Sequence, residues 1–167
     1  MMDYQFIEEQ CKRNSKIAAT LVDEFLMYYA AEDKKFRNYM EKLFAAYQHV
    51  LKDLPADAEV MYKAQYIIHR IFCKNGLINK FINHSALKHI TKEERSFLEH
   101  QIKYPWKFSY SIVVGRPAEK FFYMFDVFTG DSYLLYSPAM SKTLEERWVN
   151  LWFNLITFNG TCWQTYG

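Results

Sequence analysis

The sequence lacks the short motifs that mark several common activities. Its 167 residues contain no GxxxxGK(S/T) phosphate-binding loop, no GxGxxG dinucleotide-binding turn and no GxSxG nucleophile elbow. It also lacks any run of about 18 uncharged apolar residues, and therefore we expect no membrane span. The sequence therefore gives no support for these three types of site or for a membrane-spanning helix.

Cysteine is scarce and scattered. Cys11, Cys73 and Cys162 form no CxxC pair, and an odd number of cysteines is a poor basis for a disulfide framework. Because the chain also begins without a signal peptide, a reducing cytoplasm is the expected location. The sequence predicts no bound metal and no cofactor.

Neither sign of charge is in marked excess. The chain has 21 basic and 19 acidic residues, a net charge of +2. Nucleic-acid-binding proteins usually carry a strong, clustered basic excess. In the last third of the chain, the acidic residues offset the five basic ones, which are Lys107, Arg116, Lys120, Lys142 and Arg147. The sequence therefore favours a protein partner over nucleic acid.

The first 103 residues are predicted to form a bundle of four to five helices. Apolar residues recur at helical spacing over about residues 3–30, 34–52 and 57–75. The sequence Thr91-Lys92-Glu93-Glu94 is a capping box that begins a further helix, and Pro105 requires that helix to end before it.

The helix predicted over 57–75 carries weak candidates for catalysis. His69 and Cys73 are four residues apart and are expected to share a face, where they could ligate a metal or form an activated thiol. No other cysteine or histidine lies at a recognisable ligand spacing. The favoured alternative is a helix that is buried on both sides or that carries an interface. Val60 and Met61 are predicted to face the core, with Tyr62 on the opposite side.

Residues 104–167 are predicted to form an aromatic antiparallel β unit. All four tryptophans and more than half of the aromatic residues lie there. Alternating segments predict strands over about 107–114, 121–128, 133–136, 151–158 and 161–166. Asn159-Gly160 between the last two is a strong hairpin signal. The predicted fold is α+β, with the helical bundle packed on a small antiparallel sheet or a partly open barrel.

Residues 90–166 resemble a poorly characterised group of bacterial proteins that often carry a C-terminal SEC-C zinc knuckle. The matching features are the TKEERSFLE helix start, PWKFSY, DVFTGD, YLLYSP and the final WQ. The resemblance implies the fold and little about activity. The cysteine cluster of that group is absent here, so no zinc is implied. The position of the chain end, close to the end of a predicted strand, is also consistent with a fragment of a longer protein.

Two classes of function remain after these exclusions. The first is a non-catalytic interaction module that binds a protein, a peptide or, less favoured, single-stranded nucleic acid. Its candidate binding residues are the strand aromatics Trp106, Tyr110, Tyr123, Phe125 and Tyr133. For most of these rings the alternative is packing in the core, because aromatic side chains dominate the buried area of small β units.

The second class is a homo-oligomeric structural protein. Exposed aromatics of the β unit, or the helical face with Tyr62 and Tyr66, would form its interface. An enzyme that uses His69 and Cys73 is the least favoured alternative.

Overall fold

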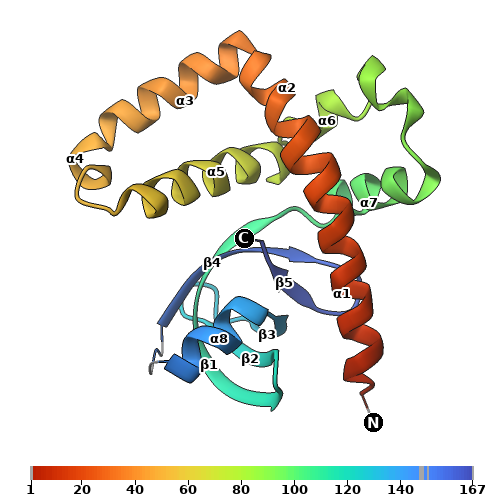
Figure 1. Ribbon diagram of the computed structural model, residues 1–167, viewed down its shortest axis with the longest axis vertical. Coiled ribbons are helices and arrows are strands. Elements are labelled where there is room, and N and C mark those ends of the chain that lie inside the picture. Colours follow the sequence, from red (N-terminus) through yellow and green to blue (C-terminus); the bar gives the residue numbers. More distant parts are fainter. Residues whose placement is uncertain (1, 147–148, 150, 167) are drawn as a thin grey trace. The chain divides into compact units, whose positions relative to one another are not determined.

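The computed structural model describes residues 2–146, 149 and 151–166 of an α+β protein (Figure 1). Its N-terminal region is helical, and its C-terminal region is a five-stranded sheet that closes into a barrel. The chain divides into two compact units. The barrel unit contains Met1–Ser15 and Lys103–Tyr166, and the helical unit contains Lys16–Ile102. The start of the first helix thus groups with the barrel, although the sequence analysis placed it in the helical region. Arg147 and Trp148 lie outside the described residues.

The barrel consists of five strands and a helix between the third and fourth. These elements are β1 (Lys107–Ala118), β2 (Phe121–Asp126), β3 (Ser132–Tyr136), α8 (Pro138–Glu146), β4 (Leu151–Phe158) and β5 (Trp163–Thr165). The strand order is β1-β2-β3-β5-β4, and β1 pairs with β4 to complete the circle. The prediction of a partly open barrel was therefore wrong: β1 is 12 residues long, and this length allows it to pair along both edges.

One pairing also departs from the predicted antiparallel sheet. β3 and β5 run parallel, with Leu135 opposite Trp163. The Asn159-Gly160 hairpin does join β4 and β5 as antiparallel neighbours. The barrel is similar in strand number to the OB fold, a five-stranded Greek-key barrel.

A glycine marks the bend in β1. The register with β2 shifts between Val113 and Gly115 and again before Ala118. A Cβ atom at Gly115 would lie 3.2 Å from Cδ2 of Tyr123. Glycine therefore allows β1 to pass close to that ring at the irregular position.

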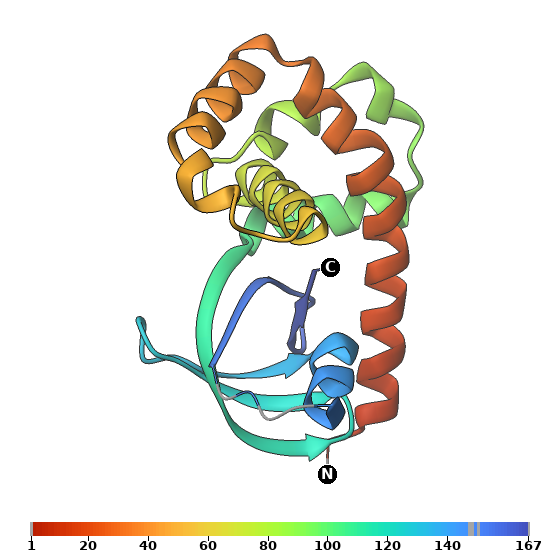
Figure 2. The ribbon, with the colours of Figure 1, turned by 60° about the vertical axis from the view of Figure 1, so that its left-hand side comes forward.

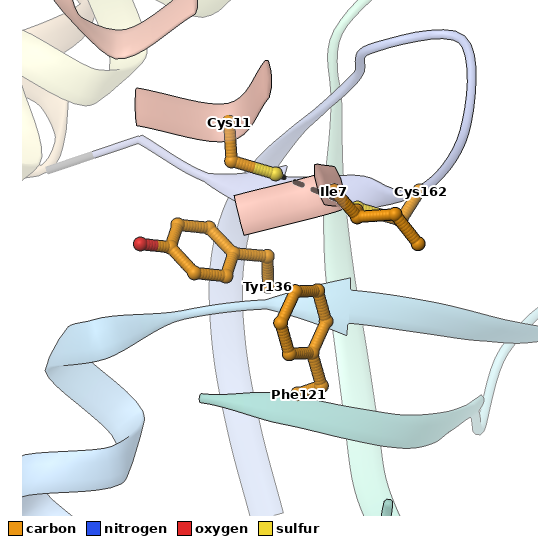
Figure 3. Close-up of a cluster of buried hydrophobic side chains, with 5 residues drawn as sticks. All are labelled: Ile7, Cys11, Phe121, Tyr136 and Cys162. Carbon is orange, nitrogen blue, oxygen red and sulfur yellow. Dashed lines mark hydrogen bonds between the residues drawn. The ribbon is translucent and has the colours of Figure 1, made fainter. Parts of the chain in front are cut away.

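Alternation along β2 separates two packed regions. Phe122 and Met124 point into the barrel, where they pack in a buried cluster that also contains Leu135, Met140 and Ile156. Phe121 points outward and is nevertheless buried, because α1 (Tyr4–Ala18) lies against it. Ile7 and Cys11 of α1 belong to this second cluster, together with Phe121, Tyr136 and Cys162 (Figure 3).

The helical unit contains more helices than predicted. After α1 the chain forms a π-helix (Ala19–Leu26), α2 (Met27–Glu32), α3 (Lys34–Ala46), α4 (Gln48–Leu51), α5 (Ala56–Phe72), α6 (Ile78–Phe81), a 3₁₀-helix (Ser85–His89) and α7 (Lys92–Lys103) (Figure 2). Seven α-helices thus precede the barrel in the described residues, where the sequence predicted four to five. The difference arises because the π-helix separates α1 from α2, because Tyr47 ends α3, and because the short α6 is a separate helix.

Local capping signals determine several helix ends. The Asp33 side chain accepts hydrogen bonds from the N–H groups of Lys35 and Phe36 and so begins α3. The predicted capping box is present, since Thr91 N–H donates to Glu94 Oε2 at 2.7 Å and Glu94 N–H donates to Thr91 Oγ1 at 3.2 Å. Among the described residues, no helix combines the length and apolar character needed to cross a bilayer.

Candidate functional site

The outer surface of β1, β2 and β4 carries exposed and half-buried apolar side chains side by side. Along β1, Ser109 and Ser111 point inward, and the residues between and beside them point outward. The strand register places Tyr110 opposite Phe153, and Ile112 opposite both Leu151 of β4 and Phe125 of β2. We call this surface the outer aromatic face. It consists of Phe108, Tyr110, Ile112, Phe125, Phe128, Leu151 and Phe153.

Ring stacking orders this face. Phe108 and Phe153 stack with their ring centroids 5.0 Å apart and an interplanar angle of 12°. Tyr110 lies between Phe128, at 5.5 Å, and Phe153, at 6.2 Å. Phe128 is 81% exposed and Phe153 is 46% exposed. The rings thus support one another while leaving apolar area in contact with water.

A tight turn after β2 holds Phe128 in place. One carboxylate oxygen of Asp126, Oδ1, accepts hydrogen bonds from the backbone N–H groups of Phe128, at 3.0 Å, and of Thr129, at 3.1 Å. Gly130 follows with a φ of 76°, which a side chain would disfavour. The position of the most exposed ring is therefore fixed by an Asx-type turn.

The inside of the barrel next to this turn is polar. Ser109 donates a hydrogen bond to Asp126 Oδ2 at 2.7 Å, and the Tyr133 hydroxyl lies 2.7 Å from Ser109 Oγ and 2.9 Å from Ser111 Oγ. Burial raises the pKa of Asp126, but the hydrogen bonds from Ser109, Thr129 and Phe128 outweigh it and lower the pKa overall. Burial also raises the pKa of Tyr133. These groups satisfy one another, and the cluster supports the turn from within.

The five strand aromatics predicted as binding residues do not share one surface. Tyr110 and Phe125 lie on the outer aromatic face, and Tyr123 is exposed with its hydroxyl 3.4 Å from that of Tyr4. Trp106 is 1% exposed, with its ring 4.8 Å from that of Tyr166. Tyr133 points into the polar interior. Trp106 is therefore buried, and Tyr133 is half-buried on the inner side of the barrel, away from the outer aromatic face.

Five members of the face were not singled out from the sequence. Phe108 and Ile112 come from β1, Phe128 comes from the turn after β2, and Leu151 and Phe153 come from β4. The sequence does show the alternation within each strand, but this alternation indicates only which residues of one strand lie on the same side. The pairing of β1 with β4, which brings Phe108 and Phe153 together, joins distant segments and has no local signal.

The opposite outer surface of the barrel is covered by α1. The ring of Tyr4 lies 5.0 Å from that of Phe121 on β2. Glu8 forms an ion pair of 2.9 Å with Lys120, in the connection between β1 and β2. Gln10 accepts a hydrogen bond of 3.2 Å from the Thr161 hydroxyl, in the connection between β4 and β5. The start of α1 thus spans β2 and two connections of the barrel.

His69 and Cys73, the weak catalytic candidates, are in the helical unit. The α5 helix ends at Phe72, and Cys73 has an extended backbone with a ψ of 168°. Cys73 is therefore the C-cap of α5, and its N–H still donates a hydrogen bond of 2.6 Å to the His69 carbonyl oxygen. The Cys73 thiol donates to the Arg70 carbonyl oxygen at 3.8 Å. Burial, followed by the nearby Arg70 charge, lowers the pKa of His69.

The described residues contain no cluster of three or more histidine, cysteine, aspartate or glutamate side chains that could hold a metal ion. In the barrel unit, three basic side chains have partners within the protein. Lys107 lies 3.6 Å from Asp131, Lys120 pairs with Glu8, and Arg116 donates to the Glu119 carbonyl and the Ser141 hydroxyl.

Comparison with known proteins gives no relative: no family model, curated protein or solved structure matches the chain. The resemblance of residues 90–166 to SEC-C-associated proteins stays a prediction.

Proposed function

We propose that the barrel unit is a non-catalytic module that binds another protein through the outer aromatic face. The observation that carries this proposal is that seven neighbouring apolar side chains, with Phe128 81% exposed, are left in contact with water on one side of the barrel. Exposed apolar surface of this kind commonly marks an interaction site. Stacked aromatic rings are also the side chains that most often dominate binding energy at protein interfaces.

A protein partner fits this surface better than a nucleic acid. A stacking platform for single strands normally lies in a basic groove that neutralises phosphates. Here Lys107, Arg116 and Lys120 already interact with groups of the barrel unit. The analogy with OB folds points the same way, since they bind oligonucleotides through strands 2 and 3 and the adjoining loops, a region that α1 contacts in this chain.

The test compares three forms of the full chain. The double variant Phe128→Ser with Phe153→Ser removes the two most exposed rings of the face. The control Tyr28→Ser removes a 59% exposed ring from α2 in the helical unit. Each form is used to capture binding proteins. Proteins that bind the wild type and the control but not the double variant are then purified, and their affinity for each form is measured by titration.

We expect the double variant to raise the Kd for such a partner by about 30-fold or more, because truncating rings at an interface centre costs at least about 2 kcal/mol in total. Circular dichroism should show the same fold for all three forms. Equal recovery with all three would refute the proposal. An oligonucleotide-induced change in tryptophan fluorescence that the double variant abolishes would assign the face to nucleic acid instead.

A homo-oligomer is the second candidate, and the start of α5 favours it. Val60 is 68% exposed, Met61 47% and Tyr62 40%. The sequence had placed Val60 and Met61 in the core, so the structure leaves an apolar helical surface uncovered. A second copy of the chain is one way to cover it.

A further inference from the structure

Two cysteines that are 151 positions apart in the sequence meet inside the barrel unit. Cys11 is on α1, and Cys162 immediately precedes β5. Their Sγ atoms are 3.7 Å apart, and both residues are buried (Figure 3). Their neighbours in the cluster are Ile7, Phe121 and Tyr136, so that water has little access to either sulfur.

A polar side chain also contacts both sulfurs. The Asn159 amide donates hydrogen bonds to Cys11 Sγ at 3.0 Å and to Cys162 Sγ at 3.5 Å. Its Oδ1 atom accepts hydrogen bonds from the backbone N–H groups of Thr161, at 3.0 Å, and of Cys162, at 2.9 Å. Gly160 completes this turn with a φ of 99°. Asn159 thus fixes the backbone of Cys162 and orients the two thiols.

The surroundings distinguish the two sulfurs. The hydrogen bond from Cys11 lowers the pKa of Cys162, and the Asn159 amide and the Tyr136 backbone N–H also lower it, while burial opposes them. The same hydrogen bond and burial raise the pKa of Cys11. These pKa directions favour Cys162 as the sulfur of the pair that loses its proton first.

We propose that Cys11 and Cys162 are an oxidation site at which a peroxide forms a disulfide between α1 and the turn before β5. A disulfide has an S–S distance of about 2.05 Å, so the sulfurs must approach by roughly 1.7 Å from the observed 3.7 Å. This inference is independent of the proposed function, because the thiol pair lies under α1 and not at the outer aromatic face.

The chemistry balances with hydrogen peroxide as the oxidant. The Cys162 thiolate attacks one peroxide oxygen, the O–O bond breaks, and the leaving hydroxide takes up a proton to become water. This step leaves a sulfenic acid on Cys162. The Cys11 sulfur then gives up its proton and attacks the Cys162 sulfur, the S–O bond breaks, and the second water leaves. Two thiols lose two electrons and two protons, and one peroxide becomes two waters.

The product would fix α1 on the barrel. In the reduced protein, α1 is held by side-chain packing, the Glu8–Lys120 ion pair and hydrogen bonds. The disulfide would add a covalent link between segments at opposite ends of the chain. Peroxide reaches the buried pair when the turn opens, and the exposed Gly160 and Thr161 lie in that turn. The oxidation is therefore expected to be slower than that of an exposed thiol.

The test uses the full chain, and Cys73 in the helical unit serves as an internal reference. The protein is treated with hydrogen peroxide and then unfolded in the presence of an alkylating reagent, which labels the free thiols. Its peptides are then identified by mass spectrometry. We expect a cross-linked pair of peptides that contain Cys11 and Cys162, lighter by two hydrogen atoms than the reduced pair. Cys73→Ser should retain this link, and Cys11→Ser and Cys162→Ser should lose it.

A second measurement does not depend on the folding of Cys11→Ser or Cys162→Ser. Oxidation should raise the Tm of the wild type and of Cys73→Ser by about 5–10 °C, and dithiothreitol should reverse the shift. The proposal is overturned if Cys73 takes part in the disulfide, if Cys162 is converted to a sulfinic acid with Cys11 unmodified, or if both cysteines remain fully alkylated after treatment.

Discussion

Asp126 shows how a single carboxylate supports the candidate binding face. It is 2% exposed and lies on the inner side of β2, where Ser109 and two backbone N–H groups donate to it. These bonds favour the ionised form, and the pKa of Asp126 is lowered although burial acts against it. The residue therefore links the polar interior of the barrel to the turn that presents Phe128.

The first prediction at this scale concerns pH. Because the folded pKa of Asp126 lies below the unfolded value of about 3.9, the stability it provides is fully present above that value. This contribution is lost as the pH falls from about 4 through the folded pKa. Asp126→Asn should cost about 1–3 kcal/mol at pH 7, since hydrogen bonds to a charged acceptor are replaced by weaker ones.

Urea unfolding at pH 7, 5 and 3 checks this expectation. The variant should lose less stability than the wild type between pH 5 and pH 3. Asp131→Asn is the matched control, because Asp131 lies in the same turn and is exposed. An unchanged pH dependence in Asp126→Asn would show that Asp126 does not provide the acid-sensitive stability.

At the scale of elements, α1 is the part of the chain that seals the barrel surface opposite to the outer aromatic face. Ile7 is 3% exposed in the cluster under α1, and the adjacent Phe6 is 57% exposed. Two neighbouring apolar residues on one helix thus have opposite environments, and they form a natural pair for comparison.

Ile7→Ala is expected to cost about 2–4 kcal/mol, because a buried side chain is removed and a cavity remains. Phe6→Ala should cost well under about 1 kcal/mol, as is usual for an exposed residue. Chemical denaturation followed by tryptophan fluorescence measures both, since the described tryptophans lie in the barrel unit. Equal losses for the two variants would contradict the burial of Ile7 against the barrel.

The elements also show where prediction from the sequence succeeds. The capping box at Thr91 and the hairpin at Asn159-Gly160 are local signals, and both are present in the structure. The closure of the barrel is not local, because residues of β1 pair with residues of β4 that lie 39 to 49 positions later in the chain. The Cys11–Cys162 contact is longer in range still, and the spacing of the cysteines gave no sign of it.

The difference between local signals and long-range contacts also explains which residues of the candidate site the sequence predicted. Tyr110 and Phe125 were singled out because they alternate within aromatic strands, and the outer aromatic face contains both. Trp106 and Tyr133 fit the same pattern but are buried or turned inward, since alternation does not tell which side of a strand faces the interior. His69 and Cys73 lie at the C-terminal end of α5, where Cys73 is the C-cap, and their catalytic role stays a prediction.

At the scale of the whole molecule, the two units offer two uncovered apolar surfaces. The barrel unit has the outer aromatic face, and the helical unit has the start of α5 with Val60 and Met61. If one of these surfaces binds a second copy of the chain, only the other surface is left to bind a different protein. The state of association in solution therefore tests whether either surface joins two copies of the chain.

We expect the wild type to remain a monomer in multi-angle light scattering over a wide range of concentrations, because the proposal assigns the outer aromatic face to a different protein. Phe153→Asp and Met61→Asp place a charge on each surface in turn and should leave that mass unchanged. A dimer that Met61→Asp alone dissociates would favour the homo-oligomer formed through α5. A dimer that Phe153→Asp alone dissociates would show that the outer aromatic face binds a second copy of this chain and would replace the proposed partner.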